Sequence, residues 1–137
     1  MDISNFMRTP ERHSQIEDGV WIKDIPGADD LELLVRGSKS SAIRAAYANK
    51  ALQERVKRGV KKVNPEEARK VHLSVMAEHV LLGWRNVKDG KKDVPYTVEL
   101  ARDWMTNPLS EFVEFVDYAV SQVDAGIEEA VEELAGN

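Results

Sequence analysis

The sequence has no cysteine among its 137 residues. Disulfides, thiolate catalysis and thiolate-bound zinc are therefore excluded, and the chain suits a reducing compartment. It also lacks any apolar run close to the roughly 18 residues that span a bilayer, and its first residues lack the basic flank and hydrophobic block of a signal peptide. We therefore expect a soluble protein of the cytoplasm that has no membrane partner.

The sequence also lacks the short motifs of common enzymes. Its eight glycines are dispersed rather than gathered in a phosphate-binding loop, and we predict that they mark the ends of structural elements. No serine stands in a glycine-flanked nucleophile motif, and the pairs of carboxylates fall on predicted polar helix faces. We therefore predict no catalytic residues and no cofactor, which indicates a non-enzymatic protein.

Histidine is scarce, with three residues in the chain. His72 and His79 lie two helical turns apart with Glu78 between them, whereas His13 belongs to an N-terminal segment without a clear period. A zinc site needs three or four ligands, and the zinc-protease motif places its two histidines four residues apart. We interpret His72 and His79 as ordinary helix residues and predict no metal site.

Positive charge is scarce towards the C-terminus. From Lys50 to Lys70 there are eight Lys or Arg and three Asp or Glu, whereas from Asp93 to Asn137 there are one and eleven. The basic run 57–62 could contact phosphates, but the pI is about 5.3 and no aromatic residues interleave with the run. Nucleic acid is therefore the less favoured partner. The asymmetry could be satisfied within the fold, between copies, or by another protein.

The remaining composition fits one domain. Hydrophobic residues make up 42% and charged residues 31%, which is typical of a globular protein, and a chain of this length can bury a core. We predict a flexible N-terminal arm over residues 1–18, a single globular domain over 19–123, and an acidic tail over 124–137 for which no regular structure is assumed.

Alternating apolar residues predict two strands near the N-terminus. Val20 and Ile22 stand on one side of the turn-forming segment 26–30, and the apolar run 31–37 stands on the other. We expect these strands to pair as an antiparallel hairpin. Because an isolated hairpin is marginally stable, it must pack on another element.

Helical periodicity begins after the hairpin. One of the serines at 38, 40 and 41 is expected to start a first helix, which Gly59 ends. Asn64 and Pro65 have the cap and first-turn chemistry of a second helix, which we predict to continue to a stop at Gly83. Its apolar residues surround the axis, so this second helix should be central and the most buried.

Two further helices are predicted. Thr97 should cap a short helix over residues 98–105, and the last helix should run over 109–123 with its apolar residues on one stripe, namely Leu109, Phe112, Val113, Val116, Ala119, Val120 and Val123. The predicted fold class is therefore α+β, mainly α, with an N-terminal β-hairpin followed by about four helices in a small bundle.

Aromatic residues surround the charged turn 88–92. Trp84, Tyr96 and Trp104 could form a ligand platform, but tryptophans beside a helix end and a turn usually close a core between elements. The Asp-Gly pair in the turn favours a tight reversal. We therefore interpret this stretch as a structural clasp, made of Gly83, Trp84, Asp89, Gly90, Pro95, Tyr96 and Trp104.

The order of these features resembles the tail assembly chaperones of long-tailed bacteriophages. The matching elements, in chain order, are a helix, Gly83-Trp84, the turn 86–90, the segment Val94-Pro95-Tyr96-Thr97-Val98-Glu99, a helix closed by Asn107-Pro108, and a final helix over 112–120. Upstream, Val35-Arg36-Gly37 is similar to the V-R-G that members carry near their N-terminal strands. The resemblance covers about residues 18 to 123.

The resemblance implies a role without catalysis, metal or cofactor in the host cytoplasm. Members keep the hydrophobic, helical tape measure protein soluble until tail tube subunits polymerise around it, and they are often made in two lengths by a ribosomal frameshift near the C-terminus. The tape measure protein is thus the expected partner. The tail tube protein and a second copy of the chain are further candidates.

A helical client exposes apolar stripes, which a chaperone covers through a helix face or a groove. We expect this groove between the segments 67–82 and 109–123, with an acidic outer face that opposes aggregation. The residues expected to contact the client are Val75, Leu82, Phe112, Val116 and Val120. The alternatives are a structural or connector (minor tail) protein that stays in the virion and a small nucleic-acid-binding protein.

Overall fold

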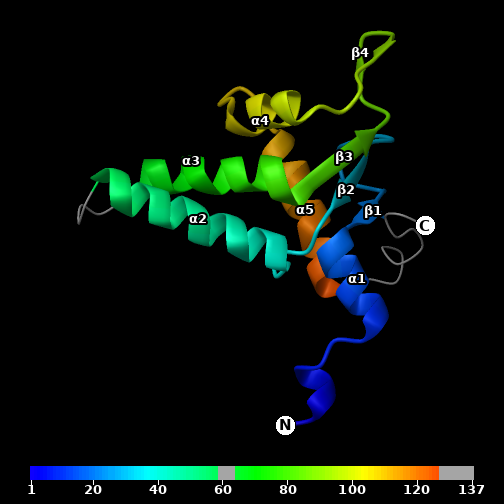
Figure 1. Ribbon diagram of the computed structural model, residues 1–137. Coiled ribbons are helices and arrows are strands. Elements are labelled where there is room, and N and C mark those ends of the chain that lie inside the picture. Colours follow the sequence, from blue (N-terminus) through cyan, green and yellow to red (C-terminus); the bar gives the residue numbers. More distant parts are fainter. Residues whose placement is uncertain (59–63, 127–137) are drawn as a thin grey trace.

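The computed structural model describes residues 1–58 and 64–126, with the backbone alone for residues 4 and 51–58 (Figure 1). Helices predominate, and the fold is α+β as predicted. The elements in chain order are η1 (Ile3–Asn5), α1 (Pro10–Asp18), β1 (Val20–Ile22), β2 (Glu32–Val35), α2 (Ser41–Arg58), α3 (Pro65–Val75), the π-helix η2 (Met76–Val80), β3 (Leu81–Arg85), β4 (Lys88–Asp89), β5 (Lys92–Asp93), α4 (Val98–Thr106) and α5 (Phe112–Ala125).

β1, β2 and β3 form a three-stranded antiparallel sheet in the order β1-β2-β3. Val20 lies opposite Val35 across the first pair, and Leu33 lies opposite Trp84 across the second. The register shifts between Leu34 and Val35, where β3 has one extra residue. Alternate residues of β1 and β2 point to a common buried face, as expected for a sheet with one covered side. The extra residue in β3 places Leu81 and Trp84, three residues apart, opposite the buried Val35 and Leu33.

The second predicted helix begins as expected but ends early. The Asn64 side chain accepts a hydrogen bond from the Glu67 N–H at 2.9 Å, and Pro65 is the first helical residue. Regular α-helix ends at Val75, however, and η2 follows directly. A π-helical turn contains one residue more than an α-helical turn. The apolar residues in and after η2 therefore no longer continue the apolar stripe that α3 begins.

Gly83 is not a helix stop. It lies within β3 opposite Leu34, and the chain is already extended at Leu81. The predicted hairpin therefore gains a third strand where we expected the end of a helix. The prediction was wrong because the apolar run 80–84 fits a buried helix and a buried strand equally well, and pairing with β2 decides between them.

Residues 1–18 also differ from the predicted arm, because they contain η1 and α1. The Thr9 hydroxyl caps α1 by accepting the Arg12 N–H at 3.1 Å, and a proline follows the cap. Ile16 is buried in the core, and the Arg12 guanidinium donates to carbonyls in the last turn of α5. A helix with one large apolar residue has no periodic stripe, so its cap was the only sequence signal.

Arg36 connects three elements. Its Nε donates to the Glu17 carbonyl at the end of α1 at 2.8 Å, and Nη1 donates to the His79 carbonyl in η2 at 2.9 Å. The Gly37 N–H donates to the Ile16 carbonyl at 3.1 Å, and a Cβ on Gly37 would lie 3.2 Å from the Ile16 side chain. The V-R-G segment is thus a junction where the approach of α1 leaves little room for a side chain at Gly37.

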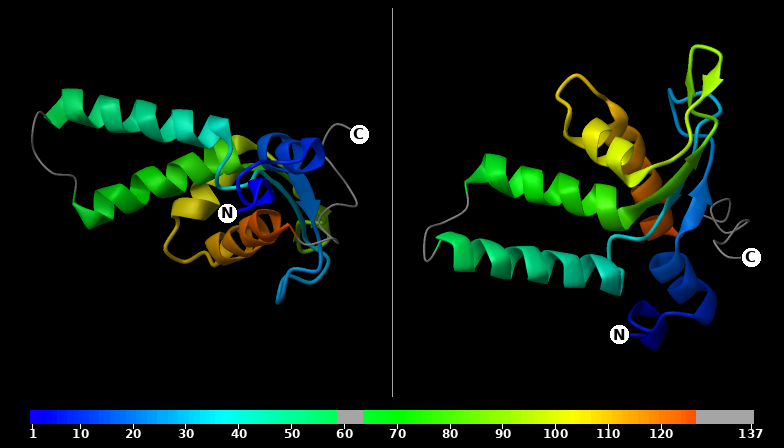
Figure 2. Two further views of the ribbon diagram at one scale, coloured as in Figure 1. Left: turned by 90° about the horizontal axis from the view of Figure 1, so that it is seen from below. Right: turned by 45° about the horizontal axis from the view of Figure 1, so that its top comes forward.

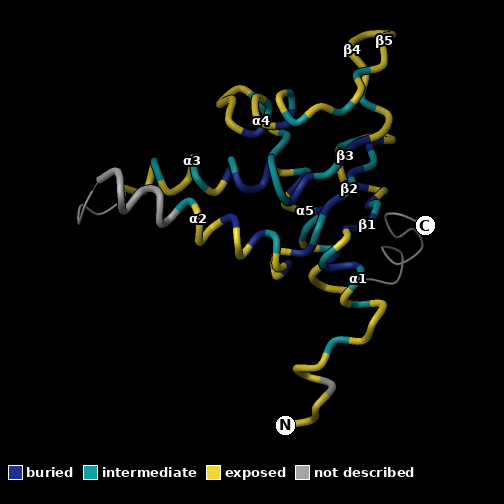
Figure 3. Tube along the Cα trace, in the orientation of Figure 1, coloured by how far each residue is buried: buried dark blue, intermediate teal, exposed yellow. Residues whose placement is uncertain are grey.

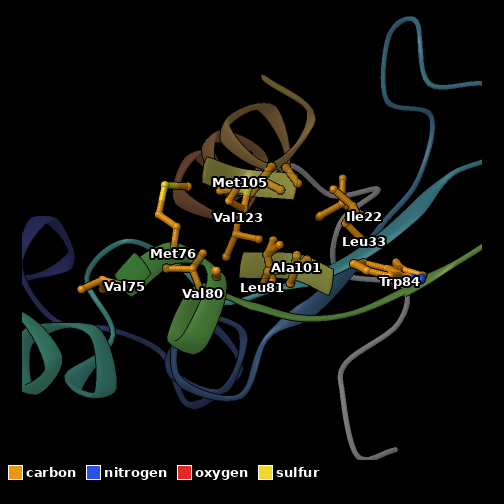
Figure 4. Close-up of a cluster of buried hydrophobic side chains, with 14 of the residues drawn as sticks. Ile22, Leu33, Val75, Met76, Val80, Leu81, Trp84, Ala101, Met105 and Val123 are labelled. Carbon is orange, nitrogen blue, oxygen red and sulfur yellow. The ribbon is translucent and has the colours of Figure 1, made fainter. Parts of the chain in front are cut away.

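The core lies between the buried face of the sheet and α5, which packs against β1 and β2. Buried positions are concentrated where the sheet, η2 and α5 meet (Figure 3). Side chains from distant segments converge there, including Leu33, Val80, Leu81, Met105 and Val123 (Figure 4). α4 covers α3 and η2, and it begins as predicted with the Thr97 hydroxyl accepting the Leu100 N–H at 3.1 Å.

α5 begins at Phe112, three residues later than predicted. The segment before it forms a turn, in which the Leu109 N–H donates to the Asn107 side chain and the Phe112 N–H donates to the Ser110 hydroxyl. Leu109 therefore leaves the apolar stripe and is 91% exposed. Local side-chain caps at residues 107 and 110 compete with the helix here.

α2 and α3 run antiparallel, side by side, and project from the sheet (Figures 1 and 2). α2 starts after Ser40, whose hydroxyl accepts the Ile43 N–H at 3.3 Å, and the Glu17 carboxylate accepts the N–H and hydroxyl of Ser41.

Burial alone raises the pKa of Glu17, but the hydrogen bonds from Ser41 and Arg8 outweigh it, so the pKa is lowered overall.

Three sequence predictions fall on parts of the chain outside the described residues. They are the end of the first helix at Gly59, the basic run 57–62 with respect to its side chains, and the acidic tail beyond Gly126. Within the tail's first residues, α5 continues to Ala125 and Gly126 caps it with a left-handed φ of 69°. None of the helices in residues 1–58 and 64–126 is long and apolar enough to cross a membrane.

Candidate partner-binding groove

Trp84 lies at the centre of a cluster of aromatic rings. Its ring stacks on Trp104 with centroids 4.7 Å apart, and it meets Tyr96 and Phe112 edge to face at 5.0 and 5.7 Å. The indole N–H donates to the Val94 carbonyl at 2.8 Å, so the polar atom of this buried side chain is satisfied. The rings pack β3, the segment before α4, α4 and the start of α5 together.

Tyr96 adds a hydrogen bond to this packing. Its hydroxyl donates to the Leu81 carbonyl on β3 at 3.1 Å. Partial burial raises the pKa of Tyr96, and the nearby Glu99 carboxylate raises it further, so the hydroxyl stays a donor at neutral pH. Pro95, the residue before it, is exposed.

The charged turn of the clasp is a small separate hairpin, β4–β5. Asp89 lies opposite Lys92, and both are exposed. Gly90 has a φ of 65°, which a two-residue turn with glycine at its first central position requires. The turn therefore reverses the chain between Trp84 and Tyr96, and its charged side chains stand in solvent.

Replacing Gly90 with alanine is expected to lower the free energy of unfolding by about 1 kcal/mol, because a Cβ is unfavourable at positive φ. A Cβ at this position would have no other atom of the described residues within 4 Å, so the cost is conformational and not steric. Urea denaturation would measure it. Gly90→Asn is the matched control, since asparagine tolerates positive φ. An alanine variant as stable as the wild type would contradict the backbone argument.

Two clefts adjoin along the facing sides of α3 and α5. The smaller has a volume of about 220 Å³ and lies where α2, η2 and the C-terminal half of α5 meet. The larger, of about 570 Å³, lies between α3, the end of α4 with the turn that follows it, and the start of α5. Asp117 lines both, so they meet at this residue. We call the two clefts together the α3–α5 groove.

The smaller cleft of the α3–α5 groove exposes mainly apolar surface, whereas the larger cleft exposes more polar than apolar surface and has an acidic α5 side. The floor side chains come from α2, α3, η2 and α5, and they are Ile43, Leu73, Met76, Val80, Val113 and Val120. On the α5 side the rim carries exposed Glu111, Glu114 and Asp117. On the α3 side it carries Arg69 and His72. This combination suits an apolar side chain or helix stripe better than a polar small molecule.

One wall of the smaller cleft is a pair of rings. The Tyr47 hydroxyl and the His72 Nδ1 are hydrogen-bonded, and the two rings are stacked with centroids 6.2 Å apart. Burial raises the pKa of Tyr47, so its hydroxyl is protonated at neutral pH and can donate to the histidine nitrogen. The pair holds α2 against α3 at the end of the groove.

The five residues predicted to contact the client lie in different parts of the structure. Val120 lines the groove. Val75 and Val116 are 0% exposed and belong to the core, so their prediction as surface contacts was wrong. Phe112 belongs to the ring cluster, and Leu82 lies on β3 beside Gly19. An apolar stripe shows which side of a helix is covered by other parts of the protein. It does not distinguish residues buried in the core from residues that line a groove.

The prediction missed the groove-lining residues that α2, α3 and η2 contribute. Ile43 and Tyr47 come from α2, and Leu73 and Met76 come from α3 and η2. Ile43 and Tyr47 stand four residues apart on a helix, a spacing that places them on one face. That spacing was the available signal, but only the fold places this face beside α5.

The two histidines of the second predicted helix, His72 and His79, contact different residues and, in the part of the chain that the structure describes, do not form part of a common metal site. His72 contacts Tyr47, while the His79 Nε2 lies 3.8 Å from a Glu78 carboxylate oxygen. Within the described residues, no three His, Asp or Glu side chains gather as a group that could hold a metal ion.

The groove and the clasp are formed by residues that follow β2, and this part of the chain matches a family model. The model is described as YdaY prophage protein and matches residues 37–137. The chain belongs to the YdaY prophage protein family. The match begins at Gly37, so in this YdaY family member it includes every residue of the groove and of the clasp. No curated protein and no solved structure matches the chain.

Membership of the YdaY family makes this a phage-derived protein, which confirms the phage origin that the resemblance implied. The name of the family says nothing about tails, tape measure proteins or chaperones. The finer prediction of a tail assembly chaperone therefore stays a prediction.

Proposed function

We propose that this YdaY family member is a non-enzymatic tail assembly chaperone, which holds the tape measure protein soluble in the host cytoplasm while the tail tube assembles. The α3–α5 groove carries the proposal, because its apolar floor and charged rim are what an amphipathic helix needs. The phage-derived family and the order of motifs from Gly83 to Pro108 also support it.

The groove has the length to hold a segment of helix. Along α5 its lining runs from Val113 to Asp124, which corresponds to roughly 16 Å at 1.5 Å per residue. About three turns of a client helix fit beside it. A stripe of apolar residues three and four apart would then reach the floor, while the rest of the client helix stays in solvent.

The strength of such an interaction also suits the proposed role. A groove of this length covers a short part of a long client, so each contact is modest and reversible, and several copies are needed along one tape measure protein. The acidic rim and the net charge of −5 keep a coated client from aggregating. Tail tube subunits could then displace the copies one by one.

Val120→Asp is expected to weaken binding of the tape measure protein at least about tenfold, because it places a carboxylate on the floor that an apolar stripe must desolvate. Val120 is half-buried, so the fold should tolerate the change. Titration of purified client, with co-expression and scoring of the soluble client fraction, would measure the effect.

Leu109→Asp is the matched control for that experiment. It makes a similar change from an apolar to an acidic residue, but at a side chain that is 91% exposed and outside the groove. Phe112→Asp is a poor probe, since Phe112 contacts Trp84 and Trp104 and the change would disturb the ring cluster. Undiminished binding by a folded Val120→Asp variant would contradict the groove.

The same proposal predicts where the protein is found in an infection. A chaperone leaves the client as the tube forms, so mass spectrometry of purified virions should not detect the chain. Detection at a fixed copy number per virion would instead support a structural or connector protein of the tail. A shift of labelled DNA at physiological salt would support the nucleic-acid-binding alternative.

A further inference from the structure

The two ends of the α3–α5 groove differ in chemistry. The smaller cleft is closed by the Tyr47–His72 pair and floored by apolar side chains of α2, η2 and α5. The larger cleft has Glu111, Glu114 and Asp117 along its α5 side. Because Asp117 lines both clefts, it places a carboxylate where they meet.

The carboxylates at this junction lack cations within the described fold. Glu114 and Asp117 are exposed and stand three residues apart on α5, where like charges repel each other. Within residues 1–58 and 64–126, neither side chain has an ion pair or a hydrogen bond. Arg69 lines the opposite side of the larger cleft without pairing with them.

The spacing along α5 relates the carboxylates to the apolar floor. Val120, in the smaller cleft, lies three residues after Asp117, so the two side chains are about one helical turn apart on the same side of α5. A helix lying in the groove presents its own side chains at the same interval. An apolar residue over Val120 would therefore place its neighbour one turn away over Asp117, with Glu114 about one further turn along α5.

We infer that the groove selects helical segments that carry an apolar anchor with a lysine or arginine about one turn away on the same face. The anchor enters the smaller cleft, whose volume of about 220 Å³ suits one large side chain, and the cation pairs with Asp117 and Glu114. This inference rests on the proposed function and specifies which segments of the client are held. It predicts that such segments carry lysine or arginine beside their apolar stripe.

Two amphipathic peptides of about 20 residues test the inference against the full-length protein, since peptides of this length can form helices in water. They share one apolar stripe and differ only in carrying lysine or glutamate one turn from each anchor. In fluorescence titrations at low salt, the lysine peptide is expected to bind about five- to tenfold tighter, and the difference should shrink as salt is raised.

A charge reversal on the protein completes the experiment. The double variant Glu114→Lys with Asp117→Lys is expected to prefer the glutamate peptide, while the control Asp103→Lys, on the exposed side of α4, keeps the preference of the wild type. Circular dichroism checks that each variant is folded. A preference for lysine that survives the double reversal would show that other residues make the selection, and it would overturn the inference.

The remaining outcomes separate the inference from the function on which it rests. If both peptides bind the wild type equally and Val120→Asp weakens both, the groove holds helices but does not select their charge. If neither peptide binds, the groove is not a helix-binding site, and the proposed function falls with the inference.

Discussion

Replacing Trp84 with alanine is expected to lower the free energy of unfolding by about 3–5 kcal/mol, the usual range for removing a buried tryptophan. Trp84 is 6% exposed and contacts three other rings, and its indole N–H satisfies the Val94 carbonyl. Alanine would leave a cavity between β3, α4 and α5 together with an unpaired carbonyl. A loss of this size is a large part of the stability of a small domain.

Urea denaturation followed by circular dichroism would measure this loss. Trp21→Ala is the internal comparison, because Trp21 is half-buried on the outer face of the sheet, where its ring lies 3.8 Å from the Arg85 guanidinium carbon. We expect that variant to lose about 1–2 kcal/mol. Equal losses for the two tryptophans would mean that the ring cluster does not hold the elements together.

Arg36→Met is expected to lower the free energy of unfolding by about 2–4 kcal/mol. The change keeps most of the aliphatic stem but removes the donors that satisfy the Glu17 and His79 carbonyls, and hydrogen bonds from a charged donor contribute more than neutral ones. Both carbonyls stand at the ends of helical segments, where the helix itself supplies no partner. α1 and η2 should therefore loosen from the sheet together.

Arg36→Lys separates geometry from charge in this experiment. Lysine keeps the positive charge but lacks the planar fork that reaches two carbonyls in different directions, so we expect a stability between the wild type and Arg36→Met. Hydrogen exchange should locate the extra opening in α1 and η2. A methionine variant with wild-type exchange in both elements would contradict the junction role.

These two positions bear on the groove, although neither lines it. The Arg36 junction holds η2, which supplies Met76 and Val80 to the floor. The ring cluster holds the start of α5, which continues as the acidic rim. The shape of the groove therefore depends on contacts made on the sheet side of the molecule, by residues that do not line it.

Local chemistry determined those features that involve neighbours in the sequence. The caps at Asn64 and Thr97 start α3 and α4 as predicted, because a cap needs one side chain and an N–H three residues away. Gly90 makes the predicted reversal for a similar reason. The order of these short signals also indicated a phage protein, which the family match confirms.

Tertiary structure decided what depends on residues far apart in the sequence. Whether residues 81–85 are helix or strand was settled by pairing with β2, about fifty residues earlier in the chain, since the apolar run fits either state. Whether Val116 or Val120 is buried in the core or lines the groove was settled by which neighbours cover each side of α5. Periodicity along one helix records that a side is apolar, but burial is a property of all the elements packed around it.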